Sequence, residues 1–191
     1  MILAKAGDVF FTSSPSLLGT AIRWAERDRG EADTEVNHTG EVTRDGFLVP
    51  HSIDDPLAET VEALWHVERN LWYQRHCGEE VTVELWRCIG QTQEEIDREV
   101  AFLYSHVGDK YGWWKLAAHF LDNKILGGKR VARRLLTVDG RPICSYLVAK
   151  AKSLAQVTFA GRPEEQTPDG MHDYVKQSAD WYIVGKEKLN G

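Results

Sequence analysis

The sequence predicts one α+β domain, residues 1–191, in which an antiparallel sheet packs against helices. Alternation of apolar and polar residues, typical of half-buried strands, dominates the segments between residues 8 and 89. Apolar residues at helical spacing follow residue 92. No repeat, low-complexity tract or linker separates the two halves, and a chain of 191 residues is long enough to bury a full core.

Five segments before residue 90 have the composition of strands: 8–12, 36–43, 47–49, 59–67 and 81–89. The last of them is the clearest, because three apolar residues alternate with other side chains. Residues 44–46, Arg-Asp-Gly, have the chemistry of a hairpin turn, so the segments on either side of them are expected to pair. A short strand over 181–184 is expected to end the fold.

Four segments have the periodicity of helices: 17–25, 92–107, part of 111–126, and 144–154. The second has the clearest start, because Thr92 and Glu95 fit a capping box. The first follows two serines and a proline, which is also typical of a helix start. Residues 161–170 are rich in glycine, proline and charge and are expected to form a loop.

Composition limits the function classes. The formal net charge of −6 argues against a general nucleic-acid binder. The basic cluster at 129–134 is interpreted as the solvated face of a short helix, with an anionic surface or polymer as the alternative partner. Three cysteines without metal-like spacing indicate neither a disulfide framework nor a metal site, and no cofactor is expected.

Nothing in the sequence predicts export or stable membrane insertion. The N-terminus lacks a basic region followed by a long apolar run, and no apolar stretch approaches the roughly 18 residues that span a bilayer. The chain is therefore expected in the cytoplasm, a reducing compartment that suits free cysteines, unless a phage particle or lysis releases it. The sequence leaves the oligomeric state open.

Cys144 is a candidate nucleophile. Pro142 precedes it, and apolar residues follow it at the spacing of one helix face, so Cys144 is expected in the first turn of a buried helix. There the free backbone N–H groups and the helix dipole favour an anion. A free thiol with a pKa of about 8.5 is only about 3% thiolate at pH 7, so this position matters for reactivity. The alternative interpretation is a small residue of the core.

A cysteine nucleophile needs a base. Among seven histidines, His38 stands out because it begins a predicted strand beside Gly40, whose missing side chain lets another chain approach closely. The other histidines are interpreted as surface or core residues: His51, His66, His76, His106, His119 and His172. Periodicity alone cannot pair His38 with Cys144, because the two lie in distant parts of the sequence.

Three short motifs resemble those of the NlpC/P60 papain-like cysteine peptidases. They are Gly-Asp-Val-Phe-Phe at 7–11, Asn-His-Thr-Gly at 37–40 and Cys-Ser-Tyr-Leu-Val at 144–148. In ordinary members the cysteine helix precedes the histidine strand, whereas here the order is reversed. The chain therefore resembles the circularly permuted branch, which includes the YiiX/YebB-like proteins and, more distantly, the lecithin:retinol acyltransferase group. Val-Glu-Ala at 61–63 and Gly-x-x-Tyr at 108–111 also match in the same order.

The resemblance implies a papain-like fold and a role for each matching residue. Cys144 is the nucleophile, His38 its base, and Glu62 the carboxylate that orients the imidazole. Tyr111 matches a tyrosine that often lines the family's site, and Ser145 and Trp113 are further candidates for contacts with the substrate or the oxyanion. The residues alone also allow Glu62 to be a solvated strand carboxylate and Tyr111 to be a core residue. Glu41, three residues after His38, is expected to point to the opposite face of the sheet.

The main hypothesis is a cysteine hydrolase that cleaves an amide bond by a thiolate–imidazolium mechanism. The resemblance implies a cell-wall, peptidoglycan-type peptide as substrate, so the expected partner is a peptide or a small acyl amide. One alternative keeps the Cys–His pair in a hydrolase or acyltransferase of lipids or N-acyl amides. The other is a papain-like module that binds peptides without catalysis. The sequence lacks zinc-hydrolase spacing such as His-Glu-x-x-His.

Overall fold

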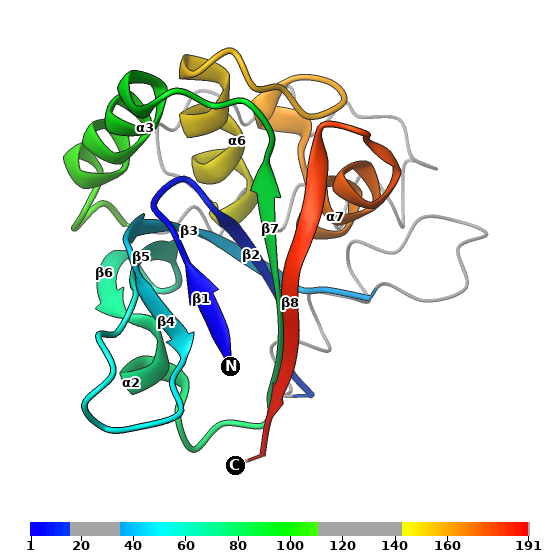
Figure 1. The fold of residues 1–191 in the computed structure, drawn as a ribbon. Coiled ribbons are helices and arrows are strands. Elements are labelled where there is room, and N and C mark those ends of the chain that lie inside the picture. The colour runs from blue at the N-terminus through cyan, green and yellow to red at the C-terminus, as the bar shows by residue number, and fades with distance from the viewer. Residues whose placement is uncertain (16–34, 111–142, 191) are drawn as a thin grey trace.

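The centre of the fold is a six-stranded antiparallel sheet (Figure 1). A computed structural model describes residues 1–15, 35–110 and 143–190. The strands run across the sheet in the order β6 (Val67–Leu71), β5 (Glu59–Ala63), β3 (His38–Arg44), β2 (Val9–Ser13), β7 (Val81–Cys88) and β8 (Trp181–Leu189). A separate two-stranded sheet consists of β1 (Ile2–Ala4) and β4 (Gly46–Val49).

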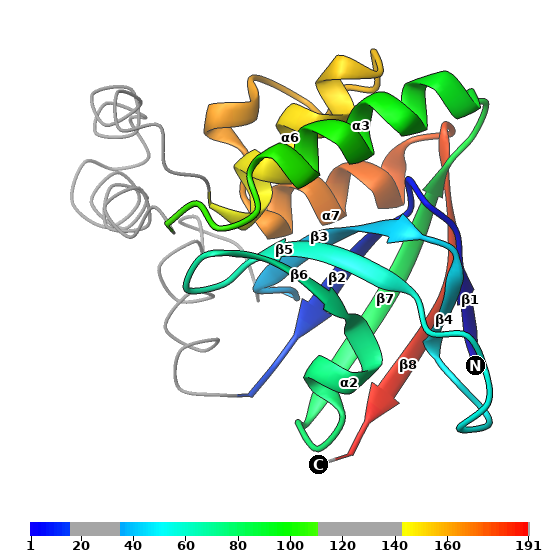
Figure 2. The ribbon, with the colours of Figure 1, turned by 90° about the vertical axis from the view of Figure 1, so that its left-hand side faces the viewer.

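Helices cover one face of the six-stranded sheet (Figure 2). They are α3 (Gln93–Ser105), α6 (Cys144–Leu154) and α7 (Pro168–Gln177), and the 3-10 turn η3 (Pro163–Glu165) lies between the last two. The short helix α2 (Trp72–His76) and the β1–β4 pair pack on the other face. The predicted α+β class, an antiparallel sheet packed against helices, is confirmed.

Alternation along the central strand β2 builds a core on both faces of the sheet. Val9 and Phe11 pack on the helix side, in a cluster with Val148 of α6. Phe10 points to the other face and meets Trp72 of α2 edge to face, with ring centroids 6.1 Å apart. The three β2 side chains have no exposed surface. Burial on both faces explains why this strand is a continuous apolar run in the sequence.

Two predicted helix starts are confirmed. At the start of α3, the Glu95 N–H donates to Thr92 Oγ1 at 3.3 Å and the Thr92 N–H donates to the Glu95 carboxylate at 2.8 Å, which completes the capping box. The helix α6 begins at Cys144, and its inner face is buried. Local sequence signals were sufficient here because caps and helical periodicity depend on near neighbours.

The predicted hairpin across residues 44–46 is wrong. The strands β3 and β4 follow one another in the chain, but β4 pairs with β1 in the other sheet. Both edges of β3 are occupied, one by β2 and the other by β5, so no edge remains for β4. A turn signal reports local backbone preference, whereas strand pairing depends on residues far along the chain.

Two strand boundaries differ from the prediction. The expected strand 59–67 ends at residue 63 as β5, and after a turn in which Trp65 is 65% exposed the chain reverses into the antiparallel strand β6, which begins at residue 67. The expected strand 181–184 continues to Leu189, because β8 pairs along the whole length of β7. In both places the alternation of residues is genuine, but the chain reversal or the pairing partner decides where a strand ends.

The helix α7 begins inside the loop expected at 161–170. Thr167 caps it by accepting a hydrogen bond from the Gly170 N–H at 3.0 Å, and Pro168 takes the first helical position. These two residues are a standard helix-start signal, which the high glycine, proline and charge content of the segment obscured.

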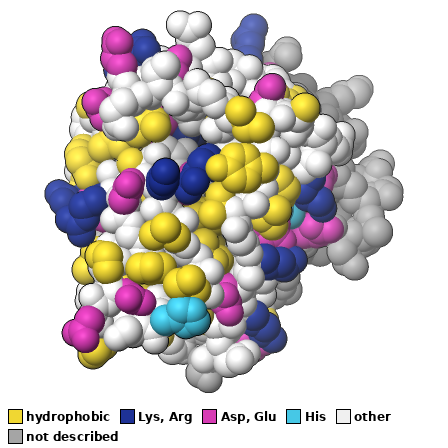
Figure 3. Space-filling view, viewed as in Figure 1, with side chains coloured by type: hydrophobic (Ala, Val, Ile, Leu, Met, Phe, Trp, Pro, Cys, Tyr) yellow, Lys and Arg dark blue, Asp and Glu magenta, His cyan; other side chains and the backbone are white. Residues whose placement is uncertain are grey.

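The exposed edge strand β8 is protected by charge. Its second half carries Lys186, Glu187 and Lys188, and Lys186 pairs with Glu84 at 2.6 Å. Figure 3 shows hydrophobic side chains gathered on the face that carries β1 and β8. Charged edge residues next to such a surface oppose pairing of β8 with a strand of another molecule.

Some predicted elements lie outside the described residues. These are the helix at 17–25, the helix within 111–126 and the basic cluster at 129–134. In the three described ranges, no helix has the length and apolar character needed to cross a membrane.

Candidate active site

Cys144 is the first residue of α6, and the fold holds its thiol among apolar side chains. Ile143, which precedes it, has an extended backbone with φ −107° and ψ 163°, so the helix starts abruptly at the cysteine. Cys144 is 5% exposed and lies in a hydrophobic cluster with Val61, Ala63 and Leu147. Close packing of this cluster against the sheet leaves the thiol little freedom to move.

His38, the first residue of β3, lies between Cys144 and Glu62. It interacts with the Cys144 thiol, so that each group shifts the pKa of the other, and its Nε2 lies 2.9 Å from Oε2 of Glu62. Because Nε2 is engaged with Glu62, Nδ1 is the ring nitrogen that remains available to the sulfur. Side chains from α6, β3 and β5 thus form a continuous Cys–His–Glu series of contacts.

Glu62 reaches His38 because Gly40 has no side chain. Gly40 is paired with Glu62 on β5 and with Phe10 on β2. A Cβ at position 40 would lie 2.7 Å from Cε1 of Phe10 and 3.0 Å from Cβ of Glu62, so the close approach predicted at this glycine is confirmed. Glu62 itself has no exposed surface, which excludes a solvated strand carboxylate.

Replacing Gly40 by alanine is expected to lower the free energy of unfolding by about 1–3 kcal/mol, because the added methyl group must displace the Phe10 ring or Glu62. Urea unfolding measures the loss. The control is Gly170→Ala in α7, where the added methyl group meets only the Thr167 hydroxyl. An unfolding midpoint of Gly40→Ala equal to that of the wild type would contradict the packing described at this position.

Burial and hydrogen bonding act in opposite directions on the Cys144–His38 pair. Burial raises the pKa of Cys144, but the hydrogen bond with His38 and its charge lower it to a value below that of an ordinary thiol. The backbone N–H groups of Thr39 and Ser145 lower it further. Burial also opposes the charged form of His38, yet Cys144 and Glu62 together raise its pKa to about 10. These shifts favour a thiolate paired with an imidazolium at neutral pH.

Of the three residues expected to contact the substrate, the structure describes Ser145. Ser145 is fully buried, and its hydroxyl donates to the Gln166 carbonyl at 2.8 Å. Its hydroxyl is therefore used within the fold, and its backbone N–H is the group that meets the sulfur. Tyr111 and Trp113 lie outside the described residues.

His76, at the end of α2, also touches this group of residues. Its Nε2 lies 3.4 Å from both carboxylate oxygens of Glu62. Burial alone raises the pKa of Glu62, but hydrogen bonds from His38 and then from His76 hold it well below the usual range. The sequence gives no signal for this contact, because α2 is too short for a periodic pattern and the contact depends on how α2 packs.

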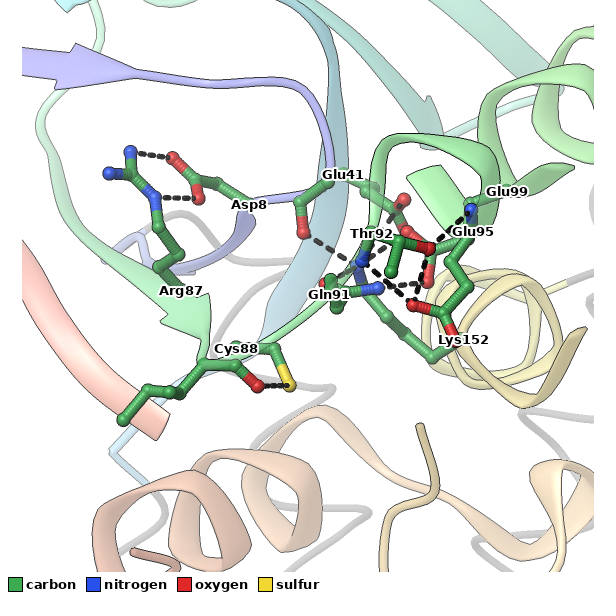
Figure 4. A network of polar contacts seen from close by, with 11 residues as sticks. Asp8, Glu41, Arg87, Cys88, Gln91, Thr92, Glu95, Glu99 and Lys152 are labelled. Carbon is green, nitrogen blue, oxygen red and sulfur yellow. Dashed lines mark hydrogen bonds and ion pairs between the residues drawn. The ribbon is translucent and has the colours of Figure 1, made fainter. Parts of the chain in front are cut away.

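A second buried polar cluster lies along α6 and joins it to β3 and α3 (Figure 4). Lys152 Nζ of α6 lies 2.8 Å from Oε2 of Glu99 on α3 and 3.6 Å from Oε1 of Glu41 on β3. All three side chains have no exposed surface. Glu41 points to the sheet face opposite His38, as expected. The cluster therefore links α6, which carries Cys144, to β3, which carries His38.

The described residues define a papain-like α+β fold in which a buried cysteine, histidine and glutamate are in contact. In this part of the chain, no three side chains of histidine, cysteine, aspartate or glutamate are grouped as ligands for a metal ion. No protein-family profile and no curated protein matches the sequence.

Among solved structures, the chain is similar to the crystal structure of metalloprotein yiiX from Escherichia coli O157:H7, DUF1105. The two chains are 15% identical, the TM-score is 0.52, and the match covers 96% of this chain and 97% of that chain. At this identity the likeness shows a common fold, and its coverage shows that the fold is shared over almost the full length of both proteins.

Proposed function

We propose that the protein is a cysteine hydrolase that cleaves amide bonds, with Cys144 as nucleophile and His38 as general acid and base. One observation carries the proposal. The thiol at the first residue of a helix has its pKa lowered by an imidazole that lies at hydrogen-bond distance from a buried carboxylate. A cysteine that only fills space in a core needs neither partner. The order of the motifs and the likeness to yiiX support the permuted NlpC/P60 branch.

In the first half of the reaction, the Cys144 thiolate attacks the carbonyl carbon and a C–S bond forms. Backbone N–H groups at the start of α6 stabilise the negative charge that develops on the carbonyl oxygen. The His38 imidazolium donates its proton to the leaving nitrogen, the C–N bond breaks, and a thioester remains.

In the second half, His38 accepts a proton from water while the water oxygen attacks the thioester carbon. The C–S bond breaks, the carboxylic acid leaves, and the proton on His38 restores the ion pair with the thiolate. Glu62 keeps the imidazole oriented throughout and stabilises its charged form, because it accepts from Nε2 inside the protein at 2.9 Å.

The yiiX protein is described as a metalloprotein. In this chain, the donors at the candidate site are engaged with one another. His38 and Glu62 meet at hydrogen-bond distance, and the sulfur faces the imidazole and two backbone N–H groups. This donor set does not fit a metal centre, and the proposed chemistry uses these side chains alone.

The substrate class rests on the motif resemblance, which favours a cell-wall peptide cut at a γ-glutamyl or diamino-acid bond. A panel of peptidoglycan stem peptides, ordinary α-peptides and fluorogenic acyl esters separates this substrate from the lipid alternative. Mass spectrometry of the products is expected to show a new amine and a new carboxylate from the stem peptides. Protein whose Cys144 has been carboxymethylated is the control. Turnover of esters alone would favour the acyl hydrolase, and turnover that survives carboxymethylation would overturn the proposal.

A further inference from the structure

We propose that His76 is a positioning residue that acts on His38 through Glu62, and that it makes the proton affinity of His38 depend on a second histidine. This inference rests on the proposed function, because it concerns the same series of contacts. It extends the Cys–His–Glu group by one residue on the side away from the thiol.

The geometry places the Glu62 carboxylate between two imidazoles. On one side, His38 Nε2 lies 2.9 Å from Oε2, and on the other, His76 Nε2 lies 3.4 Å from both oxygens. The far nitrogen of His76, Nδ1, lies 3.0 Å from Oε2 of Glu79. The contacts therefore run from buried Cys144 to Glu79, whose side chain is 48% exposed.

Both ring nitrogens of His76 face carboxylates. Ionised carboxylates only accept hydrogen bonds, so both ring nitrogens of His76 are satisfied only when each carries a proton. His76 then lies as a cation between two anions, Glu62 and Glu79. With both of these protons in place, charge alternates along the series: thiolate, His38 cation, Glu62 anion, His76 cation and Glu79 anion.

The surroundings hold His76 in this place. The residue is 6% exposed, and its ring packs on Trp72 with centroids 4.8 Å apart. Trp72 is fully buried and contacts Phe10, which in turn packs beside the His38 ring with centroids 6.2 Å apart. Two histidines that share a carboxylate are thus fixed by one aromatic cluster, which favours a constant distance between them.

The sign of the effect follows from the charges. A cation at His76 draws on the negative charge of Glu62 and repels the proton on His38, so it makes His38 a stronger acid. The groups that face this pair are Cys144 from α6, Glu62 from β5 and Glu79 after α2, with Arg75 against Glu79 at 3.1 Å. Without the cation at position 76, Glu62 holds the His38 proton more tightly, and proton transfer to the leaving amine becomes harder.

The test is the pH dependence of Cys144 alkylation by iodoacetamide, followed by peptide-level mass spectrometry so that the other cysteines do not interfere. An ion-paired thiolate gives a plateau at low pH, and loss of the His38 proton at high pH gives a second rise as the free thiolate forms. In His76→Gln, which keeps a donor but loses the charge, the second rise is expected about one pH unit higher than in the wild type. His51→Gln, in an exposed loop, is the matched control and keeps the wild-type profile.

The outcomes separate the two proposals. A wild-type protein without the low-pH plateau overturns the proposed function itself. A wild-type plateau together with a second rise at the same pH in His76→Gln overturns the role of His76 and leaves the hydrolase in place. Should His76→Gln not fold, Glu79→Gln decides, because its side chain is half exposed. A second rise at a higher pH than in the wild type supports the role of His76, and a second rise at the wild-type pH overturns it.

Discussion

Replacing Cys144 by alanine is expected to abolish amide hydrolysis, with a loss of about 10⁴-fold or more, while the protein stays folded. No other group in the described residues can form the thioester at this place, because His38 and Glu62 act only on the proton. The change removes one atom from a packed cluster and puts no new polar group into it. The His38 cation keeps Glu62 as its partner.

Steady-state turnover of the preferred substrate and the circular dichroism spectrum measure the two halves of this prediction. Cys88→Ala is the matched control, because Cys88 is a partly buried free cysteine on β7 that takes no part in the proposed chemistry. It is expected to retain wild-type turnover. Hydrolysis by Cys144→Ala at a rate near that of Cys88→Ala would end the nucleophile assignment.

Replacing Lys152 by methionine is expected to lower the free energy of unfolding by about 3–5 kcal/mol, because it leaves Glu41 and Glu99 buried without their cation. Burial already raises the pKa of Glu41 well above its usual value, and Lys152 opposes that shift. Without Lys152 the folded-state pKa rises further above that of the unfolded chain. A carboxyl group shifted in this direction costs stability as pH rises, so the deficit is smallest near pH 4 and larger at pH 7.

Urea unfolding at several pH values measures both the loss in the free energy of unfolding and its dependence on pH. Lys150→Met on the same helix is the control, because Lys150 is only partly buried. Its change in stability is expected within about 0.5 kcal/mol of zero. A loss below 1 kcal/mol in Lys152→Met, equal at all pH values, would show that the buried cluster does not hold α6 against β3 and α3.

The elements that the sequence predicts well are those that depend on near neighbours. The capping box at Thr92 and the helix that starts at Cys144 are present because both are set within a few residues. The hairpin at 44–46 is absent because β3 is flanked by two strands from elsewhere in the chain, β2 and β5. The residues of a turn do not indicate which distant strands will occupy the edges of β3.

In the candidate site, too, some residues could be predicted from short motifs, whereas others depend on packing between distant segments. Cys144, His38 and Glu62 could be named from short motifs and their order, and the fold brings these side chains into contact. His76 could not be named, because its contact with Glu62 depends on the packing of α2. Lys152 is a further case: it stands on a helix of apolar periodicity, and only the packing of three elements shows that its charge is buried.

The proposed hydrolase depends most on the ionisation of one sulfur, and the alkylation rate of Cys144 between pH 5 and pH 8 tests this ionisation most directly. An ordinary thiol with a pKa of about 8.5 is only about 0.3% thiolate at pH 6, so its rate rises about tenfold for each pH unit in this range. For Cys144 we expect a rate that is nearly constant from pH 6 to pH 8, although the residue is 5% exposed. A rate that climbs tenfold per unit, in parallel with that of exposed Cys77, would contradict the thiolate–imidazolium pair and the hydrolase built on it.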